Sequence, residues 1–87
     1  MPWYYIKTIT PGENPEPVED AHVKIDLPGI GTWEGDTNED GIFSHQDDAN
    51  VAWNAAVIGN FTLNPLDQDN PAAVAGPDTH VFTGNNP

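Results

Sequence analysis

Apolar and polar residues alternate along several short stretches of this chain, most clearly through residues 20–26, DAHVKID. There Ala21, Val23 and Ile25 are separated by polar residues, and this period of two predicts a β-strand with one buried face. Shorter stretches give weaker signals of the same kind. We expect further strands near residues 32–33, 41–45, 60–63 and 79–83.

Residues 3–9, WYYIKTI, have apolar side chains at successive positions rather than at every second one. Aromatic and β-branched residues favour strands. Apolar side chains on both faces are typical of a strand that is covered on two sides. The pattern therefore predicts a strand with both faces buried.

Residues 46–59, QDDANVAWNAAVIG, fit two alternatives. A helix here would be capped by Asp47 or Asp48 and would end at Gly59. The asparagines and valines of the stretch weaken its helix propensity. A short helix around 47–58 and an extended segment both remain open.

Proline- and glycine-rich segments separate these stretches, above all at residues 10–17 and 64–78. Several short strands with such connections predict a mostly β fold, a small antiparallel β-sandwich with at most one short helix. Residues 1–87 form a single domain. Residues 64–87 carry few large apolar side chains, so we expect this irregular C-terminal segment to dock on a partner.

The charge balance narrows the range of partners. Fourteen Asp and Glu residues stand against Lys7 and Lys24, which gives a net charge of −12 at pH 7. Such a charge repels phosphate backbones and anionic lipid, and this argues against nucleic-acid and membrane partners. The expected partners are protein subunits of a larger assembly, further copies of this chain included.

The chain has no cysteine, so disulfides and thiolate metal sites are excluded. No apolar run approaches the roughly 20 residues that span a bilayer. Residues 1–10 lack the basic start and long apolar core of a secretory signal. The composition, rich in Thr, Asn, Asp, Gly and Pro, is nevertheless typical of extracellular β domains. We expect the protein outside the cell or on the surface of a virion.

Residues 36–47 offer oxygen ligands at the spacing of a calcium-binding loop, with Gly41 at the sharp turn. The final Asp resembles that of dockerin modules, although dockerins pair two such loops and this chain has one. The alternative is a turn whose carboxylates face water. Calcium is thus a candidate cofactor, and no cofactor is required. The candidate ligands are Asp36, Asn38, Asp40, the Ile42 carbonyl, Ser44 and Asp47.

The segments on both sides of this loop resemble the carboxypeptidase regulatory-like domain family. Residues 17–25, PVEDAHVKI, and residues 37–43, TNEDGIF, match two motifs of that family, and the resemblance covers about residues 3–45. It implies a transthyretin-like (prealbumin-like) β-sandwich. A turn at Asp40 and Gly41, with positive φ at Gly41, and an inward Phe43 agree with that fold.

Large apolar side chains supply candidate anchors for a protein partner. Trp3 and Trp53 are of the type that forms interface hot spots, and Val81 and Phe82 lie in the C-terminal segment. Catalytic groups are not apparent. Ser44 and His45 are adjacent on a predicted strand and therefore point to opposite faces.

These observations predict a non-enzymatic structural or interaction module on the surface of a larger assembly. A capsid decoration (cement) protein or a tail-associated protein of a virion is the specific version that we favour. The alternative is a calcium-dependent extracellular binding module of dockerin or accessory type.

Overall fold

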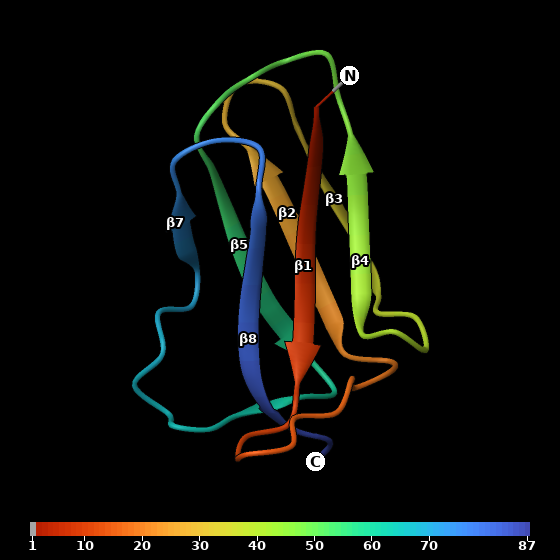
Figure 1. Ribbon diagram of the computed structural model, residues 1–87. Helices are drawn as coiled ribbons and strands as arrows, with labels where there is room; N and C mark the ends of the chain where they lie inside the picture. The colour runs from red at the N-terminus through yellow and green to blue at the C-terminus, as the bar shows by residue number, and fades with distance from the viewer. Residues whose placement is uncertain (1) are drawn as a thin grey trace.

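The computed structural model describes residues 2–87, which form eight strands in two packed four-stranded sheets (Figure 1). The strand orders are β4-β1-β8-β6 and β3-β2-β5-β7. The described chain contains no helix, and hence none able to cross a membrane. The strands are β1 (Trp3–Ile9), β2 (His22–Leu27), β3 (Gly31–Asp36), β4 (Ile42–Gln46), β5 (Trp53–Gly59), β6 (Thr62–Leu63), β7 (Ala72–Val74) and β8 (Thr79–Asn85).

The chain passes repeatedly from one sheet to the other. Among the described strands, only β2 and β3 are joined by a hairpin within one sheet, and its turn is closed by the Ile30 N–H bonded to the Leu27 carbonyl at 2.9 Å. Neighbouring strands are antiparallel except for β1 and β8, which are parallel. The predicted β-sandwich is confirmed, with this one parallel pair inside it.

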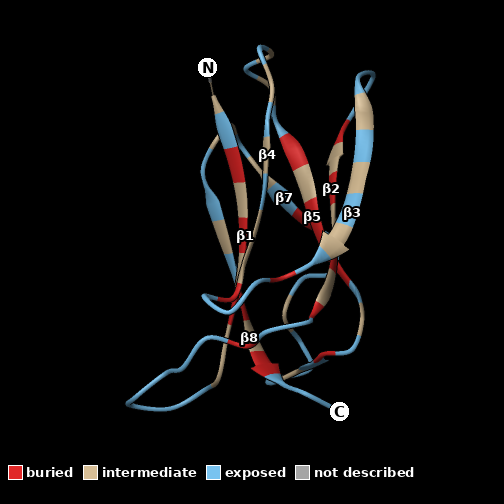
Figure 2. Ribbon diagram, turned by 90° about the vertical axis from the view of Figure 1, so that its right-hand side faces the viewer, coloured by how far each residue is buried: buried red, intermediate tan, exposed pale blue. Residues whose placement is uncertain are grey.

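The core lies between the two sheets, as the alternating burial along the strands shows (Figure 2). The predicted period of two in β2 is confirmed, because Val23 and Ile25 are fully buried while Lys24 between them is partly exposed. The buried cluster consists of Tyr4, Ile6, Val18, Ala21, Val23, Ile25, Leu27, Trp53, Ala55, Val57, Phe61, Ala72 and Phe82.

The helix considered for residues 47–58 is wrong. The second half of this stretch is β5, which pairs with β2 and β7. Trp53, Ala55 and Val57 alternate into the core, so the strand period overrides the helical one. The Asp47 carboxylate accepts the Ala49 N–H at 2.9 Å, a bond that resembles a helix cap but here belongs to the crossing between sheets.

Residues 64–87 are more regular than the sequence suggests. β7 and β8 complete the two sheets, and β8 lies between β1 and β6 with Phe82 fully buried. Two side-chain amides fix the loop before β7. The Gln68 amide donates to the Thr83 carbonyl at 2.7 Å and accepts the Thr83 N–H at 3.0 Å, and Asn70 binds both backbone groups of Val57 at 2.9 Å. The segment is therefore part of this domain's own structure.

Candidate functional site

The acidic loop forms a tight turn between β3 in one sheet and β4 in the other. The Asn38 side-chain oxygen accepts the N–H groups of Asp40 at 2.9 Å and Ile42 at 3.1 Å. Gly41 has φ +72°, which confirms the predicted turn glycine. The amide oxygen of Asn38 thus supports the backbone of the turn.

The other predicted calcium ligands are dispersed around this turn. Asp36 Oδ1 lies 2.8 Å from His22 Nδ1, on the outer face of the sheet that contains β2 and β3. Ser44 lies on the outer side of β4, and Asp47 follows the far end of that strand. Within residues 2–87 no group of three or more His, Asp or Glu side chains is placed to hold a metal ion.

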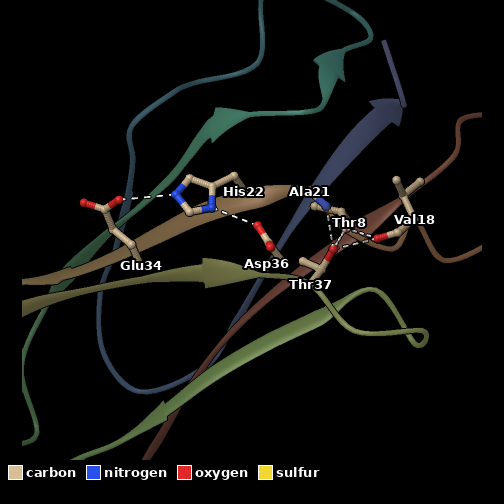
Figure 3. Close-up of polar contacts among 7 residues, drawn as sticks. All are labelled: Thr8, Val18, Ala21, His22, Glu34, Asp36 and Thr37. Atoms are coloured by element: carbon tan, nitrogen blue, oxygen red, sulfur yellow. Dashed lines mark hydrogen bonds and ion pairs between the residues drawn. The ribbon is translucent and has the colours of Figure 1, made fainter.

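Two buried threonines, Thr8 and Thr37, form hydrogen bonds next to this turn (Figure 3). The hydroxyl groups of Thr8 and Thr37 both donate to the Val18 carbonyl at 2.8 Å, and the Thr37 hydroxyl accepts the Ala21 N–H at 3.0 Å. Both side chains are nearly inaccessible to solvent. The sequence identifies Thr37 only as a motif position and gives no signal for Thr8, because a polar residue in a strand usually faces water.

The outer face of the β2–β3 hairpin is charged. His22 lies between Asp36, at 2.8 Å, and Glu34, at 3.3 Å (Figure 3). The hydrogen bond to Asp36, with a smaller contribution from Glu34, raises the pKa of His22 above its usual 6.5. Lys24 and Asp26 continue the row of charged side chains along β2.

The opposite face of the sandwich is of a different kind. We call it the β1 outer face, and its residues point away from the core on three adjacent strands. They are Trp3, Tyr5, Lys7 and Ile9 on β1, Ile42, Ser44 and Gln46 on β4, and Thr79, Val81 and Thr83 on β8. None of these residues is acidic, and Lys7 is the single charged one.

This face departs from the prediction that both faces of residues 3–9 are covered. One face of β1 lies in the core, whereas on the outer side Trp3, and Val81 of the neighbouring β8, are each 43% exposed. The rings of Trp3 and Tyr5 stack with centroids 5.9 Å apart. Of the other predicted partner residues, Trp53 and Phe82 do not lie on this face, since both are buried in the core.

A groove of about 510 Å³ opens at one end of the β1 outer face. The loop that follows β1 forms part of its wall, held by a bridge between Ile9 and Pro17. Sequence analysis missed this feature because the return of a proline-rich loop onto a sheet leaves no periodic pattern. The groove is lined by Lys7, Ile9, Pro15, Pro17, Asp40, Ile42 and Val81.

Ser44 and His45 point to opposite sides of β4, as the sequence predicts. The His45 ring stacks on Trp33, with centroids 3.5 Å apart, where the edges of the two sheets meet. His45 Nε2 also lies 3.2 Å from Asp47 Oδ2. The hydrogen bond from the Ala49 N–H lowers the pKa of Asp47, and the hydrogen bond with His45 makes a smaller contribution in the same direction. His45 on β4 therefore packs against Trp33 on β3 and connects the edges of the two sheets.

Comparisons of the chain with models of protein families, with curated proteins and with solved structures find no match. The function therefore has to be argued from the surface itself. The outer face of β2 and β3 is charged, whereas the β1 outer face has aromatic and apolar side chains and a groove lined by Ile9, Ile42 and Val81.

Proposed function

We propose that this domain is a non-enzymatic interaction module that binds a protein subunit of a larger assembly through its β1 outer face. The observation that supports this proposal is the outward row of exposed Trp3 and partly exposed Tyr5 and Ile9 on a central strand. Apolar and aromatic side chains that gather on one surface are typical of an interface. The contact needs no metal or cofactor.

The energetics favour a contact at this face over one at the β2–β3 face. Complete burial of a large apolar side chain contributes about 1.5–3 kcal/mol. The strand residues of the β1 outer face include no carboxylate, and Asp40 is the one carboxylate that lines its groove. On the opposite face a partner would have to desolvate Asp26, Glu34 and Asp36.

Within this proposal the assembly is a virion, and the domain is a capsid decoration or tail-associated protein on its outside. The strong acidity, which keeps an exposed surface soluble, is consistent with such a location. We also propose kinship with the carboxypeptidase regulatory-like family and its transthyretin-like fold. Buried Val23 and Ile25, the positive φ of Gly41 and the packing of Phe43 on the core support this kinship.

Site-specific photo-crosslinking in the intact assembly tests the proposed interface. We would replace Trp3 by p-benzoylphenylalanine, which places a reactive ketone on the β1 outer face. The matched control carries the same group at Lys24, a partly exposed strand position on the opposite face. We expect position 3 to crosslink one defined protein, identified by mass spectrometry, and position 24 to give no such product.

Equal crosslinking from positions 3 and 24 would contradict the proposed interface, and so would its absence from position 3. A melting curve of each labelled protein shows that both variants are folded. Because Trp3 lies outside the core cluster, we expect its replacement to leave the melting temperature close to that of the wild type.

A further inference from the structure

We infer that the groove of the β1 outer face binds an apolar side chain flanked by arginine or lysine, presented by an extended segment of the partner. This inference rests on the proposed function and specifies the chemistry of the partner. It depends on three properties of the groove, which are its apolar walls, its fixed shape and its charge.

The walls of the groove are apolar and come from adjacent strands. Ile42 on β4 and Val81 on β8 flank Lys7 of β1 in register, and Ile9 follows on the same side of β1. An apolar side chain that enters here exchanges water for contacts with these residues. The volume of about 510 Å³ lies within the usual range of about 300–1,000 Å³ for binding pockets.

Two prolines make the remaining wall stiff. Pro15 and Pro17 line the groove, and the ring of each fixes its own φ angle. The loop is tied back by the Glu16 N–H, which binds the Thr10 hydroxyl oxygen at 2.8 Å, and by the Thr10 N–H, which binds the Glu16 carbonyl at 2.8 Å. A preformed wall loses little conformational entropy when a ligand enters.

The charge around the groove selects the flanking residues. Asp40 lines it and is one of the fourteen carboxylates of the chain, whereas Lys7 is the only cation among the lining residues. These carboxylates attract arginine or lysine beside the inserted side chain. They repel an acidic partner, and a second copy of this chain carries the same net charge of −12.

Two synthetic peptides test this inference by NMR titration of the labelled domain. One has a phenylalanine between two pairs of arginines, and the other has glutamates in place of the arginines. We expect the arginine peptide to shift the signals of Ile9, Ile42 and Val81, and the glutamate peptide to shift none of them. Replacement of the phenylalanine by alanine in the arginine peptide should weaken binding about tenfold or more.

Variants of the domain separate the apolar contribution from the charge. We expect Val81→Ser to weaken binding of the arginine peptide about tenfold. Asp40→Asn should weaken it about two- to fivefold, as for an exposed ion pair. The control Asp67→Asn changes the net charge equally, but Asp67 does not line the groove, so we expect unchanged affinity.

Three outcomes of the peptide titrations would overturn the inference. They are equal binding of both peptides, arginine-peptide shifts confined to the β2–β3 face, and equal effects of Asp40→Asn and Asp67→Asn. A crosslinked partner with an acidic contact surface would also overturn it and leave the proposed function standing. Groove binding by the arginine peptide without any crosslink from position 3 would support this chemistry and contradict the proposed assembly role.

Discussion

Two threonine hydroxyls hold three segments of the backbone together under the turn that joins the sheets. Thr8 belongs to β1 and Thr37 to the turn after β3, and both donate to Val18 in the loop before β2. An unsatisfied buried donor or acceptor destabilises a protein by about 1–3 kcal/mol, so each bond matters in a domain this small. This network fixes the turn that carries Asp40 beside the groove.

We predict that Thr37→Val destabilises the domain by about 1–3 kcal/mol, because the Ala21 N–H loses its buried acceptor. The control Thr79→Val makes the same change at an exposed position of β8 and should alter stability by no more than about 0.5 kcal/mol. Urea unfolding measures both. Similar losses in the two variants would show that the network does not contribute as the geometry indicates.

His22 and His80 give stability two opposite dependences on pH. The carboxylates beside His22 raise its pKa, so its contribution is complete below about pH 6.5 and is lost as the pH rises through the folded-state pKa. Burial, opposed by Asp69, lowers the pKa of His80. Its neutral form contributes stability above about pH 6.5, and this contribution is lost as the pH falls through the lowered value.

NMR titration of the imidazole signals should therefore give a midpoint above 6.5 for His22 and below 6.5 for His80. In Asp36→Asn the His22 midpoint should fall, since its nearest partner loses its charge, while the His80 midpoint stays where it is. Coincident midpoints for the two histidines in the wild type would refute this assignment.

At the level of elements, the turn from β3 to β4 depends on a glycine with no room for a side chain. A Cβ atom at Gly41 would lie 2.5 Å from the Thr8 carbonyl oxygen, and its φ is already +72°. Gly29, in the β2–β3 turn, has a similar φ of +78° with open space around it. A substitution at Gly29 therefore measures backbone strain alone, whereas one at Gly41 measures backbone strain together with the steric clash.

We predict that Gly29→Ala destabilises by about 1–2 kcal/mol, the cost of left-handed backbone for alanine. Gly41→Ala should destabilise by about 2–5 kcal/mol, because overpacking adds to that strain. Thermal or urea unfolding compares them directly. Equal values would mean that the turn yields and that the close approach to Thr8 is not maintained.

The sequence predicts those strands in which the order of apolar and polar residues matches the order of buried and exposed side chains. β2 is found because Val23 and Ile25 alternate with polar residues and the core takes only one of its faces. The sequence of β5 does not distinguish a strand from a helix, because its buried small residues fit the helical period as well as the strand period of two. The pattern shows that both faces of β1 are apolar, but only one lies in the core of the described structure, and a sequence does not state which face that is.

The site residues divide in the same way. Trp3 and Val81 are exposed as a contact requires, whereas Trp53 and Phe82 have the same chemistry and are buried. Residue type alone cannot separate these cases, since the large apolar side chains that serve an interface also serve a core. The predicted calcium ligands around Asp40 would come together only if the chain curved around an ion. After Gly41 the chain instead continues as the extended strand β4.

For the whole molecule, fourteen acidic residues lie on a body whose longest dimension is 34 Å. Their mutual repulsion destabilises the compact state, and salt screens it over about 10 Å at 0.1 M. We predict that the melting temperature rises when NaCl is increased from about 0.01 M to about 0.5 M. At equal ionic strength CaCl₂ should give a similar rise, because the described side chains form no metal-binding group.

Differential scanning fluorimetry measures both salts. A further stabilisation by calcium that saturates, and that disappears in Asp40→Asn, would contradict this prediction and support the calcium alternative. A melting temperature that does not change with NaCl would show that the acidic residues are too dispersed to repel one another.

The parallel pairing of β1 with β8 has a mechanical consequence. These strands are adjacent and run in the same direction, so the two ends of the chain emerge from opposite ends of the sandwich (Figure 1). Tension applied between those ends pulls the two strands past each other and strains all of their hydrogen bonds at once. Strands that are peeled apart break such bonds one after another, so we expect the pairing of β1 with β8 to require a higher force for unfolding than a peeled pair would.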